Sequence, residues 1–281
     1  MNYELALIFL LGGLGLSVSA IYFLFSMYKQ EKLHKLQKMP FKDKYRKYLL
    51  KIPQYKNLSC EDKEKIEHSI LIFIYTKEFV GVDLEITNEM KIVIGFYACL
   101  LLLHIETKNC YENLSTIIVY PTAVMTTKES YIDGIYSKEK LLIDGQSSND
   151  TVVLIWDDIK REIIHPRSSN VIVHEFAHEI DFMDGEIDGI PPLEKSKYNE
   201  WTHTIFKDFR ELRKIIFENN DLDKDKYKFI GNYAATNEAE FFAVISERFF
   251  ESPHSLKVKF PELYNELKSF YKIDTIELIK G

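Results

Sequence analysis

The stretch VHEFAHE at residues 173–179 constrains the fold of this chain more than any other feature, because it places two histidines four residues apart with a glutamate beside the first. Side chains four residues apart lie on one face of an α-helix, so His174 and His178 would point the same way. Two neutral imidazoles held in this way can occupy adjacent corners of a tetrahedral zinc site, and Glu175 can reach a water in the open corner. The sequence therefore predicts a helix that carries two metal ligands and a general base.

The flanking residues favour a helix at this position. N-cap oxygens are available from Ser168, Ser169 and Asn170, the run 171–180 contains no glycine or proline, and Gly185 is a natural stop. The same short motif also arises by chance on ordinary amphipathic helices, where the histidines bond to carbonyls and water. A metal site therefore needs a third protein ligand, since catalytic zinc normally has three protein ligands and one water.

Glutamates further along the chain are the candidates for the third ligand. Residues 237–251 read as a second buried helix, and this helix is apolar enough that its acidic residues need a reason to be there. Glu240 and Glu247 are seven residues apart, on one face. A buried carboxylate is costly unless it is paired or bound to a metal, so at least one of them is expected to face the zinc or its histidines. A partly exposed acidic face is the alternative.

Two segments carry a resemblance to a known family: HEFAHEIDFMDG at 174–185 and NYAATNEAEFFAVISERFFESP at 232–253. Together they resemble the Mlc titration factor A family of zinc-dependent peptidases, and the similarity extends from roughly Cys60 to Tyr271. The resemblance implies a mostly helical, zincin-like α+β domain that holds one Zn²⁺ per chain and hydrolyses peptide bonds.

The resemblance also implies roles for individual residues. The ligands of the family fall on His174, His178 and Glu240, and its general base falls on Glu175. The site of anthrax lethal factor is similar in the same places and has a tyrosine seven residues before the glutamate ligand, which here is Tyr233. A phenol hydroxyl aimed at the oxyanion that forms on a carbonyl would add a useful hydrogen-bond donor. Composition alone would not select Tyr233, because the chain contains 17 tyrosines.

Charged residues follow the second histidine closely. Many zinc peptidases keep the next residue uncharged, whereas this chain has Glu179 there, a charge that the resembling family tolerates. Asp181 and Asp184 could orient the zinc histidines from behind, but acidic residues near a helix end also form turns. The sequence leaves these two roles open.

The β-branched, apolar stretch 151–156 ahead of the zinc helix reads as a strand. Peptidases of this general architecture bind an extended substrate along such a strand. An edge strand offers free N–H and C=O groups that recognise any peptide backbone. An ordinary core strand is an equally good interpretation.

The N-terminal region predicts a membrane anchor. From Leu5 to Tyr28 there are 24 residues without a charge, which is long enough to cross a bilayer as a helix. A cleaved signal peptide is the alternative, since residues 18–20 approach a cleavage pattern. No lysine or arginine precedes the apolar run, the run continues past Ala20, and basic residues follow at once. These features favour an anchor over residues 1–28.

Ten basic residues crowd the segment 29–56, against only two acidic ones. The positive-inside rule therefore predicts a single-pass protein of the cell membrane whose catalytic domain is cytoplasmic. The segment is expected to be a basic juxtamembrane linker, either solvated or lying against anionic headgroups. Since the whole chain has a formal net charge of −7, the rest is strongly acidic, which disfavours nucleic-acid binding.

Residues 57–281 are expected to form one domain, since no internal repeat or low-complexity linker divides them. The apolar run 92–105 is too short to span a bilayer and is expected to pack in the core. Cys60, Cys99 and Cys110 are expected to be unpaired thiols in a reducing compartment. Periodicity makes the fold α+β and mostly helical. Helices are expected near 61–79, 87–104, 170–182, 195–219, 237–251 and 260–271, and strands near 116–120 and 151–156.

Two classes of function follow from these observations. The first is a membrane-anchored zinc metallopeptidase with a peptide or protein substrate, and the resemblance implies activity on short peptides, including removal of N-terminal residues. The second is a regulatory protein-binding module on a peptidase scaffold, because Mlc titration factor A is named for binding a transcriptional repressor. Intact ligands favour the enzyme. No residue matches a repressor-binding surface, so no particular regulatory partner is predicted.

Overall fold

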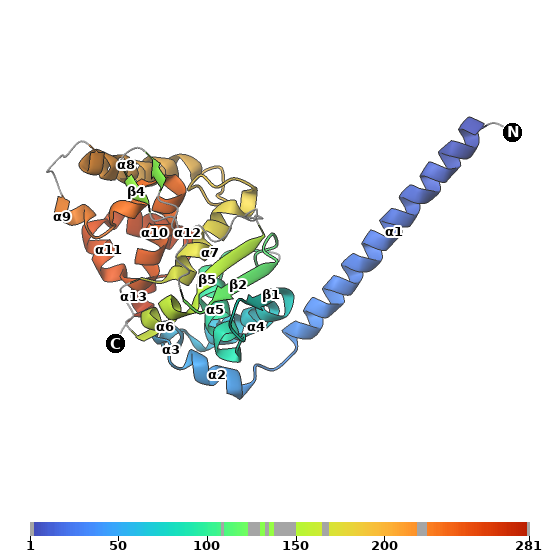
Figure 1. The fold of residues 1–281 in the computed structure, drawn as a ribbon, viewed down its shortest axis with the longest axis horizontal. Coiled ribbons are helices and arrows are strands. Elements are labelled where there is room, and N and C mark those ends of the chain that lie inside the picture. The colour runs from blue at the N-terminus through green and yellow to red at the C-terminus, as the bar shows by residue number, and fades with distance from the viewer. Residues whose placement is uncertain are drawn as a thin grey trace. The chain divides into compact units, whose positions relative to one another are not determined.

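The computed structural model describes residues 3–107, 110–122, 130–132, 135–137, 150–164, 169–217 and 224–279. The chain divides into two compact units, Met1–Phe41 and Lys42–Gly281. One long helix makes up most of the first unit, and the second unit contains the sheet and the remaining helices (Figure 1).

Helix α1, Tyr3–Gln37, dominates the first unit. Its apolar side chains between Leu11 and Tyr28 are exposed, and Leu16 and Tyr22 are each 75% exposed. The helix is long and apolar enough to cross a membrane. The structure therefore has the apolar N-terminal helix that the sequence predicts.

The second unit contains a three-stranded parallel sheet with the strand order β1-β2-β5. Val119 pairs with Leu154 across β2 and β5, and both side chains are fully buried. The sequence predicts β2 and β5 correctly and misses β1. Within the described residues β5 pairs with β2 alone, so it is an edge strand there. The strands are β1 Glu78–Gly81, β2 Thr116–Tyr120 and β5 Thr151–Ile155, and a separate antiparallel pair is formed by β3 Ser130–Ile132 and β4 Ile135–Ser137.

Helices form most of the second unit, which confirms the mostly helical α+β fold. The α-helices of this unit are α2 Asp43–Leu49, α3 Pro53–Asn57, α4 Cys60–Thr76, α5 Asn88–Leu101, α6 Trp156–Ile164, α7 Val171–Asp181, α8 Tyr198–Phe217, α9 Lys224–Tyr227, α10 Glu238–Glu251, α11 Pro253–Lys259, α12 Pro261–Tyr271 and α13 Thr275–Leu278. The six helices predicted from the sequence correspond to α4, α5, α7, α8, α10 and α12. Short helices such as α2, α3 and α13 escape a periodicity argument because they span only one or two turns.

Helix α5 is the centre of the core, as its apolar sequence predicts. Ile92, Ile94 and Phe96 are completely buried. Thr87 caps the helix by accepting a hydrogen bond from the backbone N–H of Met90. All three cysteines are free thiols, as expected.

Helices α7 and α10 pack against each other and bring together segments far apart in the sequence (Figure 1). Phe176 of α7 points into the core, where its ring lies 5.6 Å from that of Phe73 and 4.9 Å from that of Tyr111, both edge to face. On α10, Phe241 and Phe242 are fully buried. The two helices thus bury apolar faces in the core and pack against each other, which brings the histidines of α7 close to the acidic residues of α10.

The segment after α1 belongs in part to the second unit, which begins at Lys42. Tyr45 and Leu49 of α2 are buried, and Arg46 donates two hydrogen bonds to the carboxylate of Glu67 at 2.8 and 2.9 Å. From the sequence, this stretch is instead expected to be part of a linker that ends at residue 56. The many charged residues of this segment made the few apolar side chains that pack α2 against the domain hard to recognise in the sequence.

Candidate metal centre

A hydrogen-bonded cap fixes the start of α7. The side chain of Asn170 accepts a hydrogen bond from the backbone N–H of Val173 at 3.1 Å, so Asn170 is the N-cap. Ser169 instead donates to Glu162 at 2.9 Å, and Ser168 lies outside the described residues. A short 3₁₀ turn follows α7, and Gly185 ends this helical segment with a φ of +99°, which glycine adopts without strain.

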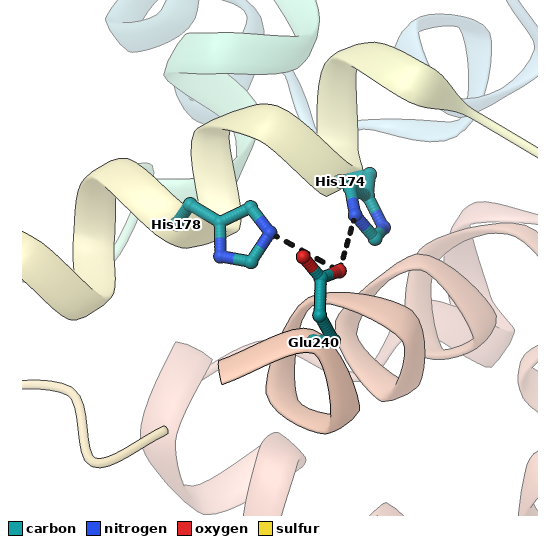
Figure 2. Close-up of side chains that lie close together, drawn as sticks. All are labelled: His174, His178 and Glu240. Carbon is teal, nitrogen blue, oxygen red and sulfur yellow. Dashed lines mark hydrogen bonds and ion pairs between the residues drawn. The ribbon is translucent and has the colours of Figure 1, made fainter. Parts of the chain in front are cut away.

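Three predicted ligands converge, two from α7 and one from α10 (Figure 2). One carboxylate oxygen, Oε2 of Glu240, lies 3.2 Å from Nε2 of His174 and 3.5 Å from Nε2 of His178. One ligand atom from each residue lies within 4.8 Å of the others. The three side chains are 12 to 21% exposed. The cluster is therefore desolvated but retains an opening to solvent.

The electrostatic environment of the cluster favours an ionised Glu240 and a protonated His174. Burial opposes ionisation of Glu240, but hydrogen bonds with His174 and His178 outweigh it and hold the pKa of Glu240 well below its usual range. Burial likewise opposes protonation of His174, and the contact with Glu240 nevertheless raises its pKa. An ionised Glu240 that lies close to both imidazoles can bind a cation together with them.

The donor set fits a metal ion. Two imidazole nitrogens and a carboxylate oxygen directed at one point are the protein ligands of many catalytic zinc sites. Both histidines present Nε2 to this point, so each Nδ1 is available for an outer partner. His174, His178 and Glu240 could together hold one ion and leave a fourth position open.

Glu247 faces the same histidine from its other side. Its Oε2 lies 3.8 Å from Nδ1 of His174, whereas Glu240 lies at Nε2. Both Glu240 and Glu247 thus approach His174, whereas the sequence predicted that at least one of them would face the metal or its histidines. Only Glu240 belongs to the cluster of possible ligands among the described residues.

The two residues expected to act in catalysis flank the cluster. Glu175 follows His174 on α7 and is half-buried. Tyr233 lies in the 3₁₀ segment Asn232–Ala235, is 54% exposed, and has its ring 5.9 Å from that of His174. The tyrosine therefore sits beside a ligand at the solvent-facing side of the cluster.

The acidic residues at the end of α7 have other roles. Asp181 is fully buried and accepts a hydrogen bond from the backbone N–H of Gly189 at 2.8 Å, while Asp184 accepts one from the N–H of Glu186 at 3.2 Å. No hydrogen bond joins either aspartate to a histidine in the part of the chain that the structure describes. Burial raises the pKa of Glu179 to about 7. The two aspartates therefore fasten turns, which was one of the two roles left open by the sequence.

Gly189 and Asn170 connect α7 to α10, a structural role that the sequence did not predict. The peptide of Gly189 bonds to Asp181 and accepts from Nε1 of Trp201 at 3.2 Å, and its Cα lies against the backbone of Glu238 at the start of α10. Asn170 donates to the buried carboxylate of Glu251 at 2.7 Å. The only feature of the sequence that pointed to the contact between Gly189 and Glu238 was an isolated glycine in a loop.

A helix that carries His174, Glu175 and His178, with both histidines directed at a glutamate of a second helix, has the arrangement typical of metallopeptidases. The chain belongs to the glucose-regulated metallo-peptidase M90 family, whose model matches residues 25–272. The family resemblance noted in the sequence is thereby confirmed. Most of α1 precedes the matched residues.

Several curated proteins are similar to this chain over most of its length. An uncharacterized protein of Synechocystis sp. is 32% identical over 232 residues, which cover 80% of this chain and 82% of that protein. Mlc titration factor A of Klebsiella pneumoniae is 29% identical over 231 residues, covering 81% and 85%. Mlc titration factor A of Escherichia fergusonii is 29% identical over 228 residues, covering 79% and 83%.

Proposed function

We propose that this chain is a membrane-anchored zinc peptidase that hydrolyses peptide bonds. The observation that supports this function most directly is the approach of both Nε2 atoms to one oxygen of Glu240. Membership of a metallo-peptidase family supports it independently. Zinc is the metal proposed because it favours a tetrahedral set of nitrogen and oxygen ligands.

Each residue at the centre has a separate task. His174, His178 and Glu240 would hold the ion, which would supply Lewis-acid polarisation of the scissile carbonyl and a lowered pKa of water. Glu175 accepts the proton of the attacking water and delivers it to the leaving amine. Tyr233 donates a hydrogen bond to the oxyanion that develops on the carbonyl. The exposure of Tyr233 is compatible with a donor that meets substrate at the surface.

The proposed substrate is a short peptide, from which N-terminal residues are removed. Strand β5 supports binding of an extended peptide, because it packs against the metal helix α7 and is an edge strand among the described residues. Backbone hydrogen bonds to such an edge give affinity without strong sequence choice. The family resemblance supports the activity on N-termini.

Helix α1 is proposed to anchor the peptidase in the cell membrane. Its exposed apolar side chains would be solvated by lipid. The basic residues that follow it, ten between 29 and 56, support a cytoplasmic position for the catalytic domain. Peptides within the cell would then be the accessible substrates.

Regulatory protein binding is the competing function. The relatives from Klebsiella pneumoniae and Escherichia fergusonii carry the name Mlc titration factor A, which refers to titration of a protein, Mlc. A binding module would not require a complete ligand set with a general base beside it. The presence of His174, Glu175, His178 and Glu240 together therefore favours the peptidase.

Zinc content and hydrolysis of the detergent-solubilised full chain test this proposal, beside the variant Glu175→Gln. We expect close to one zinc per chain in both proteins, and turnover lower by about 10²–10⁴-fold in the variant. Peptides with blocked N-termini should resist cleavage. Zinc binding without hydrolysis of any peptide would favour the binding module, and absence of zinc would refute both the centre and its mechanism.

A further inference from the structure

Helix α10 holds one imidazole from two sides. Glu240 approaches Nε2 of His174, the nitrogen that faces the proposed metal, and Glu247 approaches Nδ1. The two glutamates are two helical turns apart, on one face of α10. A carboxylate at the outer nitrogen of a histidine fixes the tautomer and the orientation of the ring and makes the inner nitrogen a stronger ligand.

The carboxylate of Glu247 is itself held in place. It is 10% exposed, its Oε1 lies 3.2 Å from Nη1 of Arg248, and the backbone N–H of Asn170 donates to it. The second of these groups belongs to the helix cap of α7, one turn before His174. Glu247 therefore contacts α7 at two places, the cap residue Asn170 and the proposed ligand His174.

Arg248 reaches a different part of the site. Its Nε donates to the backbone carbonyl of Phe229 at 3.1 Å, and its guanidinium lies 5.6 Å from the centre of the Phe229 ring. Phe229 begins the segment that leads through Gly231, at a φ of +93°, to Tyr233. Since Tyr233 is exposed, its position depends on how firmly this segment is attached to α10.

We propose that Glu247 and Arg248 are a pair of positioning residues, which hold a metal ligand and the oxyanion donor in register. Glu247 fixes the ring of His174, and Arg248 fixes the segment that carries Tyr233. The Glu247–Arg248 ion pair links the two, so that both depend on one turn of α10. This inference rests on the proposed peptidase function and adds to it two residues that touch neither metal nor substrate.

The first experiment measures the rate at which the full chain loses zinc to a chromophoric chelator. Glu247→Gln keeps the size of the side chain and removes its charge, and we expect zinc release about 10- to 100-fold faster. The visible spectrum of the Co²⁺-substituted protein, which reports ligand geometry, should also change. Glu247→Asp, which keeps the charge and shortens the reach, provides a second test should the first variant fold poorly.

Glu251→Gln is the matched control. Glu251 lies one turn further on α10, is buried, and bonds to Asn170 and Gln54 instead of a histidine. The substituted amide retains an oxygen that can accept the hydrogen bonds from Asn170 and Gln54, and it touches no histidine ring, so zinc release and the Co²⁺ spectrum should stay close to wild type. Equal acceleration in both variants would overturn the positioning role of Glu247.

The second experiment tests whether Arg248 acts through Tyr233. Arg248→Met should lower kcat about 10-fold with little change in KM, and the same change in a Tyr233→Phe background should have a smaller effect, limited to what Arg248 does through Glu247. Additive losses in the double variant would overturn this half of the proposal. Failure of the wild type itself to bind zinc or to hydrolyse peptides would instead refute the proposed function, so the two failures are distinguishable.

Discussion

Nε2 of His174 and Oε2 of Glu240 lie 3.2 Å apart although 66 residues separate them in the sequence. The contact depends on two helix caps that use the same chemistry. Asn170 accepts from the backbone N–H of Val173, and Asn237 accepts from that of Glu240 itself. His174 and Glu240 therefore each lie in the first turn of a capped helix, where the cap orders the backbone.

Replacement of Glu240 should remove a metal ligand. We expect Glu240→Gln to weaken zinc binding by more than the about 10- to 100-fold loss typical of an outer partner. Equilibrium competition with a chelator measures this effect. Glu238→Gln is the control, because Glu238 occupies the same turn but lies outside the cluster of possible ligands. Undiminished zinc affinity in Glu240→Gln would assign the third ligand to another residue.

Gly189 should not tolerate a side chain. A Cβ there would lie 2.5 Å from the carbonyl oxygen of Glu238, and the residue has a φ of +78°. Gly189→Ala should therefore lower the melting temperature and accelerate zinc release, because the start of α10 must move. Gly185→Ala provides the control: its φ is also positive, but nothing lies within 4 Å of the added atom, so only backbone strain of about 1–2 kcal/mol is expected.

The buried carboxyl of Asp181 should make stability depend on pH. Burial raises its pKa from 3.8 to about 6, so the folded state favours the protonated form. The associated stability is complete below the unfolded pKa and is lost as the pH rises from about 4 to 6. Thermal unfolding of the metal-free protein should show a smaller loss over this range in Asp181→Asn than in wild type. Identical pH profiles would contradict the assignment.

The orientation in the membrane can be tested with native cysteines, since Cys60 is exposed and Cys99 is buried. A membrane-impermeant maleimide should label Cys60 only after the cells are permeabilised, because the basic segment retains the domain in the cytoplasm. Cys60→Ser controls for labelling elsewhere. Labelling of Cys60 in intact cells would reverse the proposed topology.

Long or strongly patterned elements were predictable from the sequence. Helix α7 has a cap, a regular apolar face and a glycine stop, and its predicted bounds of 170–182 agree closely with Val171–Asp181. Strand β1 was missed because it has only four residues, and the first two, Glu78 and Phe79, fall within the helix expected near 61–79. The docking of α2 was missed because lysines surround Tyr45 and Leu49 in the sequence.

The sequence by itself determined the residue types of the centre and their placement along each helix, because a spacing of four residues fixes two side chains on one face. Spacing alone could not distinguish Glu240 from Glu247, since residues seven apart share that face equally, and only the family resemblance assigned the ligand to Glu240. Which nitrogen of His174 each carboxylate meets was decided by the packing of α7 against α10, which places Glu240 at Nε2 and Glu247 at Nδ1. Local spacing is set by backbone geometry, whereas the nitrogen that each carboxylate meets is set by the packing of two helices that lie far apart in the sequence.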